Sequence, residues 1–90
     1  MNNTNLKLCL ENKFNGIWLD QASEFYSEPD INGLWFKNGD DYLCRDGLPI
    51  FDEWIHYETE GLHPELHKIL SKYNWYAEPY DGATLLIYPM

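Results

Sequence analysis

Three histidines in the second half of the chain have the spacing that most resembles a metal site. His63 and His67 are four residues apart, so a helix would place both imidazoles on one side and within reach of one metal ion. His56 and Glu65 are additional candidate ligands. The zinc-peptidase motif, however, has a glutamate directly after its first histidine, and here Pro64 follows His63. The alternative interpretation is that His63 precedes or caps the helix and that His67 flanks its apolar face.

No other pattern indicates catalysis or a bound cofactor. Cys44 has no flanking residues typical of a reactive thiol, and a small packing thiol explains it better. Gly33, Gly39 and Gly47 are separate turn glycines, and strand-like residues follow each of them rather than the start of a phosphate-binding helix. We therefore assign no catalytic residue, no metal ligand and no cofactor, and we expect a protein that is not an enzyme.

Carboxylates and aromatic side chains gather between residues 40 and 60. Seven acidic residues face a single basic one there, Arg45, so this stretch carries two thirds of the net charge of −9. Trp and Tyr offer large, rigid contact areas, and acidic rims attract basic partners. The alternative is that the aromatics only fill a thin core. The predicted partner-binding residues are Asp40, Asp41, Asp52, Glu53, Trp54, Tyr57, Glu58 and Glu60.

A second acidic pattern precedes this stretch. Asp20, Glu24 and Glu28 recur every four residues, so one helix would stack their carboxylates at intervals of about 6 Å. Such a row can imitate a nucleic-acid backbone and occupy the basic groove of an enzyme. A solvated acidic face is the other interpretation.

Charge and composition restrict the class of partner and the compartment. A net charge of −9 opposes binding to nucleic acid or to an anionic membrane, and it favours a basic protein partner. Cys9 and Cys44 belong to no CxxC pair, and no charged apolar leader precedes Leu10, so we expect reduced thiols in a protein of the bacterial cytoplasm. No apolar run approaches the length of about 20 residues that spans a bilayer.

The elements that must position these side chains are short. Ninety residues, of which 44% are hydrophobic, and the absence of any linker predict a single domain, residues 1–90, with one core. Leu6, Leu8 and Leu10 alternate with polar residues, which predicts a strand that turns at Asn15-Gly16 into residues 17–19. Asp20 would then cap a short helix over residues 21–27, which must end before Pro29.

The rest of the chain predicts strands around one main helix. Residues 34–37, 42–45 and 48–51 read as a meander of three strands, and residues 75–80 and 84–88 read as a final hairpin. A helix over residues 64–73 has proline at its first position and an apolar face that packs on the sheet. Residues 52–61 are irregular or weakly helical. The predicted fold class is α+β, with a small antiparallel sheet of about five to seven short strands and one main helix.

Several motifs resemble known groups of proteins. The segments DGLPIF (46–51), HPELHKIL (63–70) and WYAEPYDGATLLIYP (75–89) resemble small uncharacterised proteins of phages and mobile elements. The segment NKFNGIWLD (12–20) resembles the start of acidic antirestriction proteins that mimic DNA. The first resemblance implies no activity, whereas the second favours an inhibitor; neither transfers a site residue.

The sequence therefore favours a non-enzymatic acidic protein-binding module. Such a module would be a phage-encoded inhibitor of a host defence or nucleic-acid-handling enzyme, similar in action to anti-restriction or anti-CRISPR proteins. A small metal-binding domain or metal-dependent enzyme that uses His63 and His67 is the alternative from another class. A homodimer through an unpaired strand edge also stays open.

Overall fold

A computed structural model describes residues 1–39 and 41–90. Within these ranges the chain forms a four-stranded antiparallel sheet with order β1-β2-β4-β3, three α-helices and one 3-10 turn. The strands are β1 (Leu19–Gln21), β2 (Leu34–Phe36), β3 (Trp75–Pro79) and β4 (Leu85–Pro89). The helices are α1 (Asn3–Lys13), α2 (Ala22–Tyr26) and α3 (Pro64–Lys72), and the 3-10 turn covers Tyr57–Thr59. The α+β class is confirmed, whereas five to seven strands is too many for the described part.

The main helix and the final hairpin are confirmed. Proline stands at the first position of α3, and the helix buries Leu66 and Leu70 on one face. It ends at Lys72, and Asn74 turns the chain with a φ of +60°, the left-handed conformation that asparagine tolerates well. Strands β3 and β4 then pair from Trp75 opposite Pro89 to Pro79 opposite Leu85.

The opening strand predicted around Leu6, Leu8 and Leu10 is wrong, because this segment is helix α1. Asn2 caps the helix by accepting a hydrogen bond from the backbone of Asn5 at 2.8 Å. Leu6 and Leu10 are fully buried, whereas Leu8 is 55% exposed. Residues i and i+4 share a helical face, so the same leucine spacing that suggested alternation serves a helix. The predicted hairpin of residues 6–19 therefore does not form.

Two further predictions fail along the first half of the chain. Asp20 lies in β1 and does not cap a helix, because α2 starts at Ala22 with Gln21 before it. Residues 42–51 contribute isolated bridges, Leu43 with Pro49 and Phe51 with Leu62, instead of two strands. Strand β2 is already paired with β1 on one side and β4 on the other, so the next segment finds no free edge beside it.

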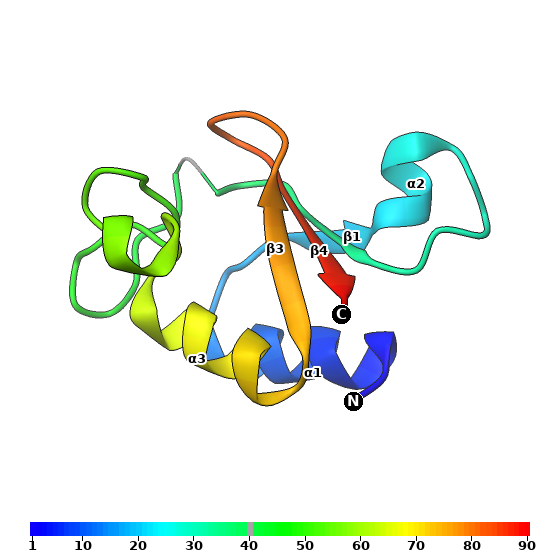
Figure 1. Ribbon diagram of the computed structural model, residues 1–90, viewed down its shortest axis with the longest axis horizontal. Coiled ribbons are helices and arrows are strands. Elements are labelled where there is room, and N and C mark those ends of the chain that lie inside the picture. The colour runs from blue at the N-terminus through cyan, green and yellow to red at the C-terminus, as the bar shows by residue number, and fades with distance from the viewer. Residues whose placement is uncertain (40) are drawn as a thin grey trace.

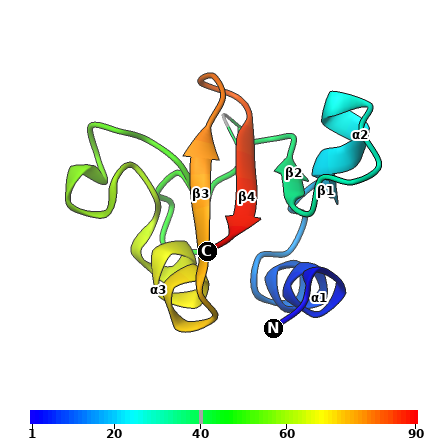
Figure 2. The same cartoon turned by 45° about the vertical axis from the view of Figure 1, so that its right-hand side comes forward.

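The hydrophobic core lies between one face of the sheet and the pair α1 and α3. Figures 1 and 2 show these two helices next to each other below the strands, with α2 beyond β1. Leu34, Phe36, Leu85 and Ile87 are fully buried on the central strands. The opposite face carries Trp35, whose ring lies 5.0 Å from that of Phe25 on α2. None of the helices in the described part combines the length and apolar character that a bilayer crossing needs.

Candidate partner-binding site

Residues 52–61 form a compact loop whose two ends are joined; we call it the acidic loop. The backbone N–H of Asp52 donates to the carbonyl of Gly61 at 2.8 Å, and the bridge between Phe51 and Leu62 lies just outside. The backbone N–H of His56 donates to the carbonyl of Asp52 at 3.0 Å. A loop of this length with paired ends is an Ω-loop, which packs by its own side chains. Figure 1 shows it at the end of the molecule away from α2.

Buried groups hold the acidic loop from inside. His56 is 6% exposed, and its Nε2 lies 2.8 Å from the carbonyl oxygen of Pro49. A carbonyl only accepts hydrogen bonds, so Nε2 carries the proton and donates. Gly61 has a φ of +91°, and a Cβ there would lie 2.8 Å from the ring of Phe51. The hydroxyl of Thr59 donates to the carbonyl of Leu62. The loop therefore has a defined shape.

The outer surface of the acidic loop presents large side chains to solvent. Trp54 is 91% exposed, Tyr57 is 74% exposed and Ile55 is 51% exposed. Oδ1 of Asp52 accepts hydrogen bonds from the backbone N–H groups of Trp54 at 2.9 Å and Ile55 at 3.0 Å. Asp52 therefore fixes the turn that carries Trp54, a structural role that the sequence analysis did not assign to it.

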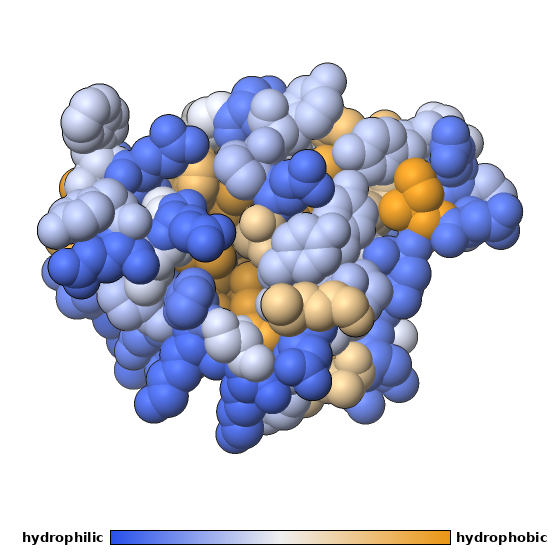
Figure 3. Space-filling model, in the orientation of Figure 1, coloured by the Kyte–Doolittle hydropathy of each residue, from blue (hydrophilic) through white to orange (hydrophobic). Residues whose placement is uncertain are grey.

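The acidic loop carries four carboxylates and neither lysine nor arginine. They are Asp52, Glu53, Glu58 and Glu60. Among residues 1–39 and 41–90, no lysine or arginine forms an ion pair with any of them. Figure 3 shows hydrophilic residues over this end of the molecule. Six of the eight predicted partner-binding residues thus lie on this one loop.

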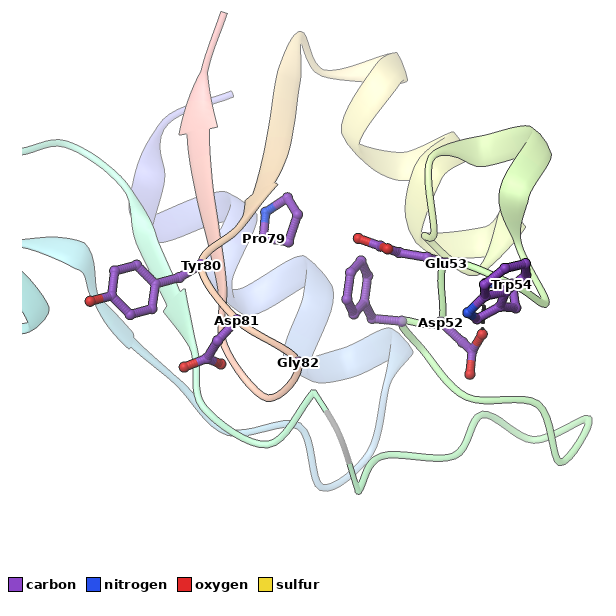
Figure 4. A pocket seen from close by; sticks show the side chains of 8 residues that line it. Asp52, Glu53, Trp54, Pro79, Tyr80, Asp81 and Gly82 are labelled. Atoms are coloured by element: carbon purple, nitrogen blue, oxygen red, sulfur yellow. Dashed lines mark hydrogen bonds between the residues drawn. The ribbon is translucent and has the colours of Figure 1, made fainter.

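A groove separates the acidic loop from the turn that joins β3 and β4. Its volume is about 450 Å³, and Phe51, Glu53, Pro79 and Asp81 are among the residues that line it. In Figure 4 the carboxylate of Glu53 points across the groove toward Pro79, whereas Trp54 lies on the outer side of the loop. Figure 3 shows hydrophobic residues in the hollow between this end and the central strands. The groove is therefore partly apolar, and Glu53 directs a carboxylate into it.

The structure places the predicted site residues in three groups. Asp52, Glu53 and Trp54 line the groove. Tyr57, Glu58 and Glu60 lie on the same loop but not among the groove residues. Asp41 is exposed in the turn after β2, away from the groove lining, and Asp40 lies outside the described residues.

Sequence reasoning missed the part of the site that the hairpin contributes. Pro79, Asp81 and Gly82 line the groove, although 27 or more positions separate them from Asp52 in the chain. The pair Asp81-Gly82 signalled only a turn. Tyr80 also borders the groove, but its ring points away from it in Figure 4 and lies 4.9 Å from that of Phe25.

The histidines do not form the hypothesised metal pair. His63 is 3% exposed; its Nδ1 accepts from the backbone N–H of Glu65 at 3.1 Å, and its Nε2 donates to Asp46 at 2.8 Å. His63 therefore caps α3, as the alternative interpretation held, and both its nitrogens are occupied. His67 is exposed. In the described part of the chain, no group of three or more His, Cys, Asp or Glu side chains could hold a metal ion.

A second cleft contains Cys44 and has mixed charge. Its volume is about 520 Å³, and Lys13 and Glu65, which form an ion pair at 3.5 Å, lie on its lining. Burial first, and then the carboxylates of Asp46 and Glu65, raise the pKa of the Cys44 thiol to about 11. Cys44 and Cys9 are both free thiols. A thiol that stays protonated at neutral pH is a poor nucleophile.

The predicted row of Asp20, Glu24 and Glu28 is wrong. Only Glu24 lies within a helix, because α2 covers Ala22–Tyr26. Asp20 lies in β1 and forms an ion pair with Lys37. These three carboxylates therefore do not stack on one helical face, and helical mimicry of a phosphate row has no basis here.

No family model matches the chain, and neither the curated proteins nor the solved structures gave a match.

Proposed function

We propose that the protein is a non-enzymatic binding module that engages a basic protein partner through the acidic loop. The observation that carries this proposal is the exposure of Trp54, 91%, and Tyr57, 74%, on a loop whose ends and interior are tied down. The backbone that carries these aromatic side chains is already ordered, so it loses little conformational freedom on binding. Their burial against a partner is therefore favourable.

The aromatic and acidic side chains of the loop are expected to contribute differently to binding. Buried aromatic anchors typically contribute 2 kcal/mol or more when they are hot spots, so Trp54 and Tyr57 would supply most of the affinity. Exposed carboxylates contribute less to affinity but raise the association rate with a basic surface and reject acidic ones. Glu53, Glu58 and Glu60 would have this steering role.

The partner class that fits best is a basic protein that handles nucleic acid in a bacterial host cell. Proteins of this class present lysine and arginine to phosphate, and a chain with a net charge of −9 is drawn to the same surface. A phage-encoded inhibitor of a defence enzyme is the form of this function that the sequence resemblance suggests. Mimicry would then be local to the acidic loop, because the Asp20 row does not form.

Affinity capture with matched variants tests the proposal. Tagged wild-type protein, a Trp54→Ala/Tyr57→Ala variant and a Trp18→Ala control are incubated with bacterial lysate at low salt and at about 1 M salt, where the Debye length is about 3 Å. Trp18 is 58% exposed and lies outside the acidic loop. We expect one basic protein that the wild type and the control retain at low salt and the loop variant loses. Equal retention by all three proteins, or no specific protein at all, would overturn the proposal.

A further inference from the structure

Strand β3 lies at the edge of the sheet and has a neighbouring strand on one side only. The strand order is β1-β2-β4-β3, and β3 pairs with β4 over its full length of five residues. An edge strand offers unpaired backbone N–H and C=O groups to a strand of another chain. The other edge strand, β1, has three residues and leads directly into α2. Strand β3 is therefore the better candidate for pairing with another chain.

The backbone hydrogen bonds at both ends of β3 show which of its residues face β4. The carbonyl of Asn74 accepts from the backbone N–H of Met90, and the backbone N–H of Tyr80 donates to the carbonyl of Thr84, both at 2.9 Å. Successive residues of an antiparallel pair direct their backbone groups alternately toward the partner strand and away from it. The residues of β3 with even numbers therefore bond to β4, and those with odd numbers point outward.

The outward residues are Trp75, Ala77 and Pro79. Within residues 1–39 and 41–90, none of the three forms a backbone hydrogen bond to another element. Proline has no N–H, so the free edge offers two donors and three acceptors. Only Trp75 among the five residues of β3 is buried. The edge is therefore open to a further strand, and Pro79 limits the donors to its first part.

The free edge of β3 lies on the same side of the sheet as the acidic loop. Figures 1 and 2 both show the loop beyond β3, on the side away from β4. The groove of about 450 Å³ separates the loop from the end of β3 and reaches the edge at Pro79. An extended segment that entered here would pair with β3 by its backbone, and every second side chain would face the groove.

Charge selects the kind of chain that fits this edge. Glu53 directs its carboxylate into the groove, and Glu78 is exposed on β3 itself. In the described part of the chain, neither carboxylate forms an ion pair with lysine or arginine. A second copy would bring another nine net negative charges to the same place. A basic segment of another protein fits instead.

We propose that β3 accepts a basic, extended segment of the partner as an additional strand of the sheet. The backbone of the segment pairs with Trp75 and Ala77, and its lysine or arginine side chains lie beside Glu53 and Glu78. The inference rests on the proposed function, since it specifies how one part of the basic partner is held. Trp54, on the outer side of the acidic loop, then contacts the body of the partner.

Amide NMR of the labelled protein with three short peptides tests the inference. The probes are acetyl-Lys-Val-Lys-Val-Lys-amide, the same peptide with glutamate in place of lysine, and the lysine peptide with every backbone nitrogen methylated. Methylation keeps the side chains and their charges but removes all backbone donors. We expect the lysine peptide to slow hydrogen exchange at the amides of Trp75 and Ala77, because both become hydrogen-bonded. The other two peptides should leave this exchange unchanged.

Two substitutions at residue 77 separate backbone pairing from side-chain packing. Ala77→Pro removes an outward N–H and leaves the bonds to β4 in place, and Pro79 already occupies the next outward position. Ala77→Val adds a side chain of similar size and keeps the N–H. We expect Ala77→Pro to weaken binding of the lysine peptide at least about fivefold, as the loss of one hydrogen bond implies, and Ala77→Val to change it less than about twofold. The methylated peptide makes the same comparison on the unaltered protein.

Three results would overturn the inference: equal binding of the lysine peptide and its methylated form, unchanged exchange at Trp75 and Ala77, or equal weakening by the two substitutions. Exchange at these amides that slows with protein concentration, without peptide, would place a second copy on the edge and also overturn it.

The proposed function fails separately, through the capture experiment. If the wild type retains a basic protein that Trp54→Ala/Tyr57→Ala loses and Ala77→Pro still retains, the proposed function stands and the added strand falls. If the lysine peptide protects Ala77 but no specific protein is captured, the proposed function falls alone.

Discussion

Replacing Gly61 with alanine should destabilise the protein and distort the acidic loop. Gly61 has a φ of +91°, and an alanine Cβ there would lie 2.8 Å from the ring of Phe51 and 3.3 Å from Cγ of Glu53. A left-handed conformation costs an L-residue about 1–2 kcal/mol. Forcing an extra carbon into a filled space costs about 1–3 kcal/mol more. Both costs fall on the residue that closes the loop.

Gly47→Ala is the matched control for this prediction. Gly47 has a φ of +82°, but nothing lies within 4 Å of a Cβ placed there. The two variants therefore share the conformational cost and differ in the overlap with Phe51 and Glu53. We expect Gly61→Ala to be less stable than Gly47→Ala by about 1–3 kcal/mol, and each kcal/mol should lower Tm by about 4–8 °C in a domain of this size.

Urea and thermal unfolding, monitored by tryptophan fluorescence, measure the difference. Amide NMR spectra of the two folded variants add a local test, because Gly61→Ala alone should shift residues 51–54. Equal stability of the two variants, with unchanged signals from residues 51–54, would refute the claim that Gly61 closes the loop against Phe51.

Three further predictions test the core, a pH-dependent contact and the buried thiol. Leu6→Ala should cost about 2–5 kcal/mol in urea unfolding and Leu8→Ala less than about 0.5, because only Leu6 is buried; similar costs would support a strand there. Hydrogen bonds from the backbone N–H of Leu48 and then from the buried His63 lower the pKa of Asp46. The ionised carboxylate therefore stabilises the fold above its ordinary pKa of about 3.9, and this stabilisation is lost as the pH falls through the lowered pKa. Asp46→Asn should flatten this acid dependence, and an unchanged acid profile would contradict it. In a Cys9→Ser background, Cys44 should react with a disulfide reagent at pH 8 at least tenfold more slowly than the unfolded chain, because its pKa is raised to about 11; equal rates would show an accessible thiolate.

The parts of the fold that the sequence predicted are those with strong local signals. Helix α3 combines proline at its first position with an apolar face, and the β3–β4 hairpin combines alternation with Asp81-Gly82. The opening strand failed because Leu6 and Leu10 satisfy both a period of two and a helical spacing of four. Asn2 caps α1 and favours the helix, but it precedes the leucine pattern on which the prediction was based.

The composition of the candidate site was predictable, but its assembly was not. The excess of carboxylates and the two aromatics of the acidic loop are visible in the sequence. The groove needs Pro79 and Asp81, and their position depends on sheet order and on long-range packing. Asp52 fixes the turn by accepting hydrogen bonds from the backbone N–H groups of Trp54 and Ile55, and no local motif in the sequence predicted these bonds.

His63 shows why spacing alone did not decide between chemistry and structure. Four residues separate it from His67, yet His63 is the cap of α3 and its Nε2 donates to Asp46. The proline that follows it had favoured this reading. The contact with Asp46, 17 positions away, could come only from the tertiary structure.

Site-specific crosslinking in host cells tests the central claim most directly. Benzoylphenylalanine replaces Tyr57 on the acidic loop or Tyr26 on α2, which are 74% and 41% exposed. The account predicts an adduct with the captured basic protein from position 57 and none from position 26. An adduct from position 26 alone would contradict it, because the partner would then lie on the opposite end of the molecule from the acidic loop.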